Sequence, residues 1–467
     1  MKHPKSNRTN LSRHLLTAYE AMSQKGKVQF LEETVFFDLI DHYQCEQQPG
    51  KILQVINHAI QQYPSTMEFY FAKARYYLQV DEVSLAKAVL KKALIYSPFD
   101  FGLHLMLAEI FGRMAQYPKA YKVLDYLKSI TEGKDVAKIY VCEAVILQSE
   151  KRLAEQFNAL KKALQIDPEA DAALDQIWWS MECTGRYVET ALLHEQILET
   201  NAFNAKAWLN AGKAYDAMGK TEDAIDAFEF ALFLDDRLEM AYRDVVELLI
   251  DTKQYKRALT TLQEAVRLFS ADALYCYQIA YCNEMLGERT IAKAFYLKAL
   301  DFEKDLEDVF FRLGECYGKE KDWKTAIYFY NKAIALNDDN AAYFMSLEKA
   351  YHCTKDYDNA DASFEKAVMI DPLSPDCWIQ HILFQLDRGN TDLAFENLEA
   401  AHLNSGDEKL LYCHAICYYR TGDHNSALEQ LGEALNADFG LFPCIFEMCP
   451  EMDFDDRVQA LIELYRH

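Results

Sequence analysis

The stretch of sequence that decides the fold is residues 205–237, AKAWLNAGKAYDAMGKTEDAIDAFEFALFLDDR. Its apolar side chains recur at three- and four-residue spacing in two blocks, which is the spacing of one face of an α-helix. The first block is Trp208, Ala211, Gly212 and Tyr215, and the second is Ala224, Phe228 and Ala231. Gly219 lies between the blocks and favours a turn. The pattern predicts two helices that cross closely, because Gly212 and Ala224 carry almost no side chain to hold them apart.

The same pattern recurs along the chain about every 34 residues. About twelve repeats fill residues 33–441, and they begin near residues 33, 67, 101, 137, 171, 205, 239, 273, 307, 341, 375 and 408. The repeat that begins at Glu307 matches nearly as well as the first stretch. This repetition predicts an all-α array, in which each helix pair buries its apolar face against its neighbours.

Both ends of the chain differ from the repeats. Residues 1–32 read as a basic tail and a leading helix, whose apolar face consists of Leu11, Leu15, Leu16, Tyr19 and Met22. Residues 442–467 read as a C-terminal capping helix with Asp453 as a candidate N-cap. Its apolar face consists of Phe454, Val458, Leu461, Ile462 and Tyr465. Helices of this kind can cover the open ends of a stack of repeats.

Two repeats break the pattern. In the repeat that begins at Asp171, Trp178 occupies the usual small position, and Thr190 and His194 replace the expected alanine and aromatic residue. We therefore expect the helix crossing to be opened or shifted there, with a change of superhelical pitch between Thr131 and Asn201. Glu348 also occupies a small position, and we expect its carboxylate to tilt into solvent rather than find a buried partner.

The composition excludes several classes of function. The chain has 467 residues, with 49 Lys and Arg against 73 Asp and Glu, so its formal net charge is −24. An acidic surface repels phosphate backbones, so no nucleic-acid partner is expected. The longest apolar runs, such as Phe230–Leu234, are too short to cross a membrane, so no membrane insertion is expected. No signal peptide is recognisable, and a cytoplasmic protein is predicted.

The twelve cysteines do not form a disulfide pattern. Most fall at positions where a small apolar side chain fits a helix, and no C-x-x-C motif occurs, so reduced thiols are expected. Cys413, His414 and Cys417 fall close together near His424. Because a second ligand pair at structural-zinc spacing is absent, neither a metal site nor a cofactor is predicted.

The repeats resemble the tetratricopeptide-repeat (TPR) proteins. Residues 205–237 follow that family's pattern of W-x2-L-G-x2-Y and then A-x3-F, with Ala211 where leucine is commonest and Asp236 where proline is. The stretches TVFFDLIDHY, FFRLGECY and ALIELYR further resemble long, acidic, all-repeat bacterial proteins. The resemblance implies a right-handed α-solenoid superhelix of helix-turn-helix repeats, with an inner groove that holds a peptide or a partner's helix.

The groove positions of the TPR family can be placed on this chain. They give these candidate partner-binding residues: Trp179, Leu209, Lys213, Arg243, Tyr277, Tyr281, Phe311, Tyr412 and Tyr419. Exposed aromatic side chains would anchor a partner, although the same rings could instead pack against neighbouring repeats. A clamp for the acidic tail of a chaperone is not expected, because the paired asparagines of that clamp are missing. The corresponding positions hold Leu209, Lys213, Arg243, Val245 and Glu247.

Three functions are compatible with this pattern. A non-catalytic scaffold or adaptor for protein partners is favoured, because the repeats consume nearly all of the chain. A chaperone or regulator that holds one secreted or signalling protein would present the same groove, and self-association through a terminal repeat is also open. An enzyme is not expected: Glu182, Glu247, Glu284 and Glu315 align on successive repeats, but they read as solvated groove carboxylates.

Overall fold

The computed structural model describes residues 13–24 and 28–466, and within these ranges every regular element is helical. The chain forms two compact halves, Met1–Leu248 and Leu249–His467. The first half contains α1 (Arg13–Gln24), α2 (Glu33–Cys45), α3 (Pro49–Gln62), α4 (Met67–Gln79), α5 (Val83–Tyr96), α6 (Phe101–Arg113), α7 (Tyr117–Ile130), α8 (Asp135–Ser149), α9 (Leu153–Ile166), α10 (Asp171–Thr184), α11 (Tyr187–Thr200), α12 (Ala205–Ala217) and α13 (Thr221–Leu234). Helix α14 (Glu239–Asp251) contains the boundary between the halves.

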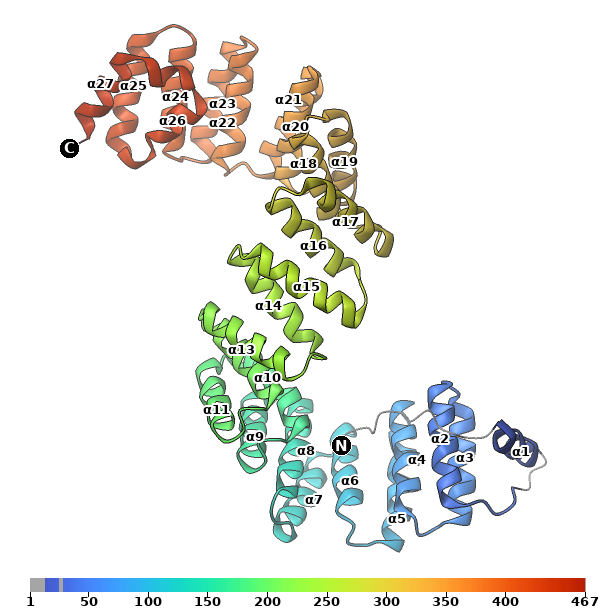
Figure 1. Cartoon of the computed structure of the whole chain (residues 1–467). Helices are drawn as coiled ribbons and strands as arrows, with labels where there is room; N and C mark the ends of the chain where they lie inside the picture. The colour runs from blue at the N-terminus through green and yellow to red at the C-terminus, as the bar shows by residue number, and fades with distance from the viewer. Residues whose placement is uncertain (1–12, 25–27, 467) are drawn as a thin grey trace. The chain divides into compact units, whose positions relative to one another are not determined.

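The second half continues with helices of similar length as far as α25, followed by the shorter α26 and α27. These are α15 (Tyr255–Phe269), α16 (Ala273–Met285), α17 (Arg289–Phe302), α18 (Glu307–Lys319), α19 (Trp323–Leu336), α20 (Ala341–Thr354), α21 (Tyr357–Ile370), α22 (Pro375–Asp387), α23 (Thr391–Asn404), α24 (Lys409–Arg420), α25 (His424–Ala437), α26 (Pro443–Met448) and α27 (Asp456–Tyr465). Within each half, consecutive helices lie side by side and are joined by short turns, as in a solenoid (Figure 1). The division into twelve TPR repeats with capping ends, and the right-handed superhelix, stay predictions.

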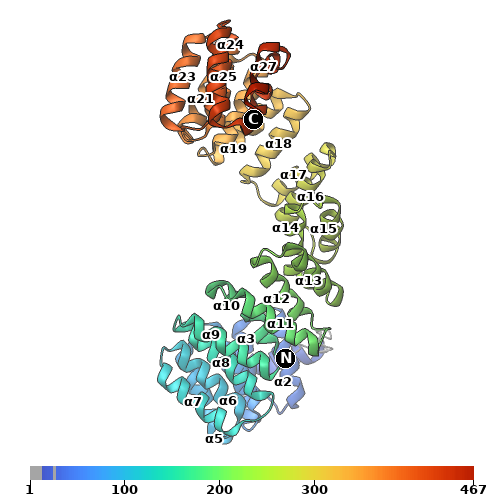
Figure 2. The ribbon, with the colours of Figure 1, turned by 90° about the vertical axis from the view of Figure 1, so that its left-hand side faces the viewer.

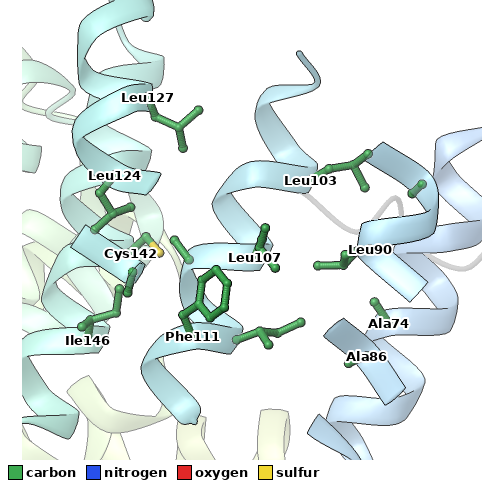
Figure 3. Close-up of a cluster of buried hydrophobic side chains, with 14 of the residues drawn as sticks. Ala74, Ala86, Leu90, Leu103, Leu107, Phe111, Leu124, Leu127, Cys142 and Ile146 are labelled. Atoms are coloured by element: carbon green, nitrogen blue, oxygen red, sulfur yellow. The ribbon is translucent and has the colours of Figure 1, made fainter. Parts of the chain in front are cut away.

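The core of each half lies between neighbouring helices rather than at one centre. Figure 3 shows Leu103, Leu107 and Phe111 of α6 between two neighbouring groups of side chains. On one side lie Ala74, Ala86 and Leu90, and on the other lie Leu124, Leu127, Cys142 and Ile146. Each helix therefore buries two faces, because it packs on the helices before and after it.

The helix pair that decides the fold packs as the spacing predicts. A Cβ atom on Gly212 of α12 would lie 2.7 Å from two ring atoms of Phe228 in α13. Ala224, Phe228 and Ala231 are buried on the facing side of α13. Gly219 has a φ of +73°, a backbone conformation that glycine adopts at little cost, and it ends the turn between the two helices. The close crossing predicted from small residues is confirmed at this pair.

The tightest of these approaches gives a testable stability prediction. A Cβ atom on Gly314 of α18 would lie 2.5 Å from two ring atoms of Tyr330 in α19. We expect Gly314→Ala to lower the free energy of unfolding by about 1–3 kcal/mol, because the crossing has no room for a methyl group. The control is Gly432→Ala in α25, whose nearest neighbour would be the Tyr465 hydroxyl at 3.4 Å. Alanine is the better helix former, so urea unfolding should show the control unchanged or up to about 1 kcal/mol more stable. A Gly314→Ala protein as stable as wild type would contradict the close crossing.

The irregular repeat is opened, as its sequence predicts. The backbones of α10 and α11 lie close together over a much shorter stretch than those of α8 and α9 or of α12 and α13. Trp178 stands at the position that Gly212 and Gly314 hold in the close crossings, and the Nζ atom of Lys213 lies 4.2 Å from the centre of the Trp178 ring. His194 is fully buried, and its Nδ1 atom donates to the Thr190 carbonyl at 2.8 Å. Burial lowers the pKa of its imidazole to about 4, although this hydrogen bond acts in the opposite direction. The predicted change of superhelical pitch stays a prediction.

The expectation that Glu348 tilts into solvent is wrong. Its residue is only 4% exposed, and it lies on the face of α20 that also buries Tyr343, Leu347 and Ala350. The helix register places this position in the interface whichever residue occupies it. Burial raises the pKa of the Glu348 carboxyl to about 8, although the neighbouring Lys349 ammonium acts in the opposite direction.

The two ends are partly as expected. Tyr19 of α1 is buried, and its hydroxyl lies 2.9 Å from Nδ1 of His58 in α3, so this helix packs against the array. The basic tail and Leu11 lie outside the described residues. At the other end Val458 and Ile462 are buried. Asp455 rather than Asp453 caps α27, by accepting the Arg457 amide at 3.0 Å, because the preceding residues form a short 3₁₀ turn that delays the helix.

Candidate functional site

The candidate residues of the second half centre on two tyrosines of α16. Tyr277 and Tyr281 are one helical turn apart, and their rings stack with centres 6.4 Å apart and planes inclined by 16°. The ring of Tyr281 also meets the edge of Tyr255 from α15 at 6.3 Å. Both tyrosines of the pair are half-buried, so part of each ring faces outward. Figure 2 shows α16 followed by α17 and α18 in this half.

Arg312 of α18 completes this aromatic surface. Its guanidinium carbon lies 4.9 Å from the centre of the Tyr281 ring, a cation–π distance. No carboxylate oxygen of the described residues lies within 4.0 Å of its nitrogens. Burial opposes the charge of Arg312, but the Glu284 carboxylate and the nearby tyrosines more than offset it and raise the pKa of the guanidinium. The arginine is therefore held charged by aromatic rings and by an acidic group at longer range.

A buried carboxylate supports this surface. The side chain of Glu284 is only 1% exposed. It accepts a hydrogen bond from the Tyr296 hydroxyl at 2.9 Å and one from the Lys319 ammonium at 2.8 Å. Burial, followed by the nearby Glu284 carboxylate, raises the pKa of Tyr296 well above its ordinary value. Helices α16, α17 and α18 are thus tied together beside the tyrosine pair, since the Tyr296 ring also lies 5.9 Å from the Tyr277 ring.

Phe311 lies apart from the tyrosine pair. Its ring packs on Tyr343 of α20, with centres 4.7 Å apart, and on Tyr330 of α19, with centres 5.9 Å apart. It is also half-buried, but its contacts run toward the following repeat rather than the preceding one. Of these three candidate rings, only Tyr277 and Tyr281 therefore share one surface with Arg312.

In the first half, the candidate Lys213 is already engaged. Its ammonium lies over the Trp178 ring, and its Nζ atom is 3.2 Å from Oδ2 of Asp244. Only 11% of the side chain is exposed. Burial raises the pKa of Asp244, while the Lys213 ammonium acts to lower it. This cation therefore stabilises the opened repeat and presents little charge to a partner.

The remaining candidates of the first half are scattered. Trp179 is half-buried, whereas Leu209 is buried at 8% exposure. Arg243 donates from Nη2 to Oε1 of Glu239, four residues earlier in α14, at 2.8 Å. The described structure does not bring these three side chains into one cluster comparable to that of Tyr277, Tyr281 and Arg312.

Known sequence families match several parts of the chain. Models described as tetratricopeptide repeat match residues 205–235, 308–340 and 342–372, and the first two of these contain the close crossings at Gly212 and Gly314. The chain contains tetratricopeptide repeats. A further model, described as ChAPs (Chs5p-Arf1p-binding proteins), matches residues 33–160 of this TPR chain. No curated protein matches it.

Solved structures of other helical repeat proteins are similar to this TPR chain. The APC/C hetero-tetramer Cut9–Hcn1 is 16% identical, with 91% of this chain and 96% of that chain covered and a TM-score of 0.39. The Pseudomonas aeruginosa protein pilF is 17% identical over 55% of this chain and 100% of its own, with a TM-score of 0.37. YrrB, titled a TPR protein with an unusual peptide-binding site, is 19% identical, with 38% of this chain and 92% of that chain covered and a TM-score of 0.34.

Tyr412 is not exposed on the surface of this TPR protein, contrary to expectation. The residue is fully buried, and its hydroxyl donates to the Asp438 carbonyl at 2.5 Å. The chain after α25 folds back over α24 through a 3₁₀ turn and α26, and a repeat pattern ending near residue 441 does not reveal that cover. Tyr419 stays half-buried and packs edge-on against His424, with ring centres 5.0 Å apart.

The four aligned carboxylates of the TPR repeats differ in their surroundings. Glu182 and Glu247 are exposed, and Glu315 accepts a hydrogen bond from the Tyr330 hydroxyl at 2.7 Å. The expectation of solvated groove carboxylates is wrong for Glu284, because Tyr296 and Lys319 reach it from two other helices and enclose it. Glu182 and Glu284 share the twelfth position of their repeats, yet the first is exposed and the second is enclosed.

The cysteine cluster of this TPR protein lies in its core. Cys413 and Cys417 are fully buried in α24, and the His414 ring stacks on Tyr418 with centres 5.1 Å apart. Within residues 13–24 and 28–466, no group of three or more histidine, cysteine, aspartate or glutamate side chains is arranged to hold a metal ion. In the same ranges, no helix combines the length and the apolar character that a membrane span needs.

The residue of this aromatic surface that sequence reasoning missed is Arg312. It stands next to the predicted groove position Phe311, and the family pattern assigns position six of a repeat no groove role. The available signal was its place one repeat after Tyr277 and Tyr281, since neighbouring first helices of TPR repeats lie side by side. Only the packing of α16 with α17 and α18 places its guanidinium over Tyr281.

Proposed function

We propose that this TPR protein is a non-catalytic interaction scaffold, which binds a peptide or a partner's helix at the surface formed by Tyr277, Tyr281 and Arg312. The observation that carries the proposal is the pairing of two stacked, half-buried tyrosines with a guanidinium that no carboxylate of the described residues contacts. Tyrosines bury a large area on binding at a small cost in side-chain entropy, and they are enriched among the residues that dominate interfaces.

Arg312 defines the chemistry of the partner in this proposal. A guanidinium can hold a carboxylate through two parallel hydrogen bonds, which adds directional specificity to the apolar contact. A partner segment with an aspartate, a glutamate or its own terminal carboxylate beside an apolar side chain would fit both parts of the surface. Glu284, which is buried, keeps the tyrosines and Arg312 in place and is not available to the partner.

The class of function agrees with the sequence families. TPR folds generally mediate protein–protein interactions, and the family that matches residues 33–160 is described by the proteins it binds. A cytoplasmic location belongs to the same proposal. All twelve cysteines are free, eight of them buried, as suits a protein kept in a reducing compartment.

Affinity capture from the native cell extract tests the proposal. The tagged chain should retain a defined partner, and Tyr281→Ala combined with Arg312→Gln should reduce its recovery at least tenfold, because the loss of two anchor contacts costs about 2 kcal/mol or more. The matched control is Tyr328→Ala, which removes an equally large ring that is 57% exposed on α19. Circular dichroism melts should show all three proteins folded.

The outcome also separates a scaffold from a client-holding chaperone. A scaffold should retain two partners at once through different surfaces, whereas a chaperone should hold one client in a fixed stoichiometry. If the double variant captures the same proteins as wild type in the same amounts, the Tyr277–Tyr281–Arg312 surface is not the binding site.

A further inference from the structure

We propose that a pocket of the first half, formed by α11, α12 and α13, binds an arginine side chain presented by a basic segment of a partner protein. The pocket has a volume of about 330 Å³. Its walls include three aromatic rings and three carboxylates, from Trp208, Tyr215, Phe230, Glu195, Asp223 and Asp226. Aromatic faces and carboxylates both attract a cation, and a guanidinium can use the two together.

The aromatic wall of the pocket is held in place before any partner arrives. The rings of Trp208 and Phe230 stack with centres 5.1 Å apart and planes inclined by 19°. The indole nitrogen of Trp208 donates to the Ala202 carbonyl at 2.9 Å, which fixes the orientation of that ring. Phe230 is 54% exposed, so a planar group can stack on it without moving the helices. A rigid planar wall suits the flat guanidinium better than a rounded ammonium group.

The carboxylates of the pocket are poorly neutralised. Asp223 and Asp226 are exposed near the start of α13, and neither makes an ion pair with any part of the chain that the structure describes. Glu195 of α11 accepts a hydrogen bond from the Tyr215 hydroxyl at 2.8 Å, which leaves its charge in place. Lys220 supplies the one basic side chain among the residues that line the pocket. Three carboxylates against one ammonium leave a net negative charge.

Lys220 shows how the pocket receives a cation. Its ammonium lies 5.7 Å from the centre of the Tyr215 ring, at one wall of the pocket. It contacts none of the three carboxylates within 4.0 Å in the described residues. The stacked wall of Trp208 and Phe230, with Asp223 and Asp226 nearby, therefore remains available to a second cation.

Charge complementarity decides the occupant. A chain with a formal net charge of −24 attracts basic segments and repels acidic ones over several ångströms. The planar wall then selects arginine over lysine at short range. This pocket goes beyond the proposed function, because it lies in the other half of the chain, takes the opposite charge and can fail without affecting the Tyr277–Tyr281–Arg312 surface.

Fluorine NMR of the full chain labelled with 5-fluorotryptophan tests the pocket directly. The chain has five tryptophans, and Trp208→Phe assigns the resonance of Trp208. The probes are three short peptides, acetyl-Gly-Ser-X-Ser-Gly-amide, in which X is arginine, lysine or the uncharged isostere citrulline. We expect the arginine peptide to shift the Trp208 resonance with saturation, the lysine peptide to bind more weakly and the citrulline peptide to leave it unchanged. Added salt should weaken the arginine peptide's binding.

Two isosteric variants decide the role of the carboxylates. Asp223→Asn combined with Asp226→Asn should weaken the binding of the arginine peptide about three- to tenfold, as expected for the loss of two exposed ion pairs. The control, Glu199→Gln with Asp236→Asn, removes the same charge from exposed positions that do not line the pocket. No shift of Trp208 at millimolar peptide, equal weakening by both double variants, or equal binding of citrulline and arginine would each overturn the proposal.

Discussion

Replacing Glu348 by glutamine should raise the free energy of unfolding by about 2–5 kcal/mol at pH 9 and leave it almost unchanged at pH 4.5. The wild-type carboxyl is 4% exposed, and burial raises its pKa to about 8 from an ordinary value of 4.5. No hydrogen bond or ion pair of the described residues compensates for its burial. A difference of one unit in pKa between the folded and unfolded states corresponds to about 1.4 kcal/mol. Because the site can partly relax around the ionised carboxyl, the change in the free energy of unfolding should be smaller than the whole pKa difference would give.

The sign follows from where the proton binds more tightly. Because the pKa of Glu348 is higher in the folded state, the folded protein prefers the protonated form. Ionisation of the carboxyl therefore does not lower the free energy of unfolding below pH 4.5, the ordinary pKa. The loss of stability grows as the pH rises from there to about pH 8. Above that range the full cost is present. Glutamine cannot ionise, so the variant should lose this part of the dependence of stability on pH.

Urea unfolding at a series of pH values, followed by circular dichroism, measures this effect. The matched control is Glu365→Gln, an exposed glutamate of α21, which should change stability by less than about 0.5 kcal/mol at every pH. Hydrogen exchange of Glu348→Gln should show the increase in protection in α20 and α21, because local opening of a repeat array is confined to neighbouring helices. If wild type and Glu348→Gln show the same pH dependence, Glu348 is not buried as described.

The second large effect is expected at Glu284. Its replacement by alanine should lower the free energy of unfolding by about 3–5 kcal/mol, because the Tyr296 hydroxyl and the Lys319 ammonium lose their common acceptor inside the packed helices. Glutamine keeps an acceptor oxygen for Tyr296, so Glu284→Gln should cost only about 1–3 kcal/mol. Hydrogen exchange of α16, α17 and α18 should show the loss of protection, since the carboxylate joins these three helices.

Lys319→Met provides the control for Glu284. The lysine side chain is 43% exposed, so its loss leaves the Tyr296 hydrogen bond intact and should cost no more than about 1–2 kcal/mol. If Lys319→Met destabilises the protein as strongly as Glu284→Ala, the ion pair rather than the buried tyrosine bond holds the three helices together. If neither changes protection of α16–α18, the carboxylate is not a structural centre of the second half.

The candidate site shows which part of a repeat protein is open to prediction. The repeat register correctly placed Tyr277 and Tyr281 one turn apart on α16, because that spacing is a property of a single helix. It gave no means to separate them from Phe311, which packs toward the following repeat, or from Tyr412, which the chain end covers. Arg312 was missed because its role depends on the approach of α18 to α16, and no spacing within one helix encodes that approach.

The sequence by itself determined the all-helical class, the helix pairs and the close crossings at Gly212 and Gly314, because small residues at a fixed offset are a local requirement of each pair. It also located the opened repeat at Trp178. Only the tertiary structure decided that Glu348 and Glu284 are buried, the first without a hydrogen-bond or ion-pair partner among the described residues and the second between two partners. Two buried glutamates therefore have opposite consequences for stability, because their partners come from neighbouring helices whose approach the sequence of one repeat does not specify.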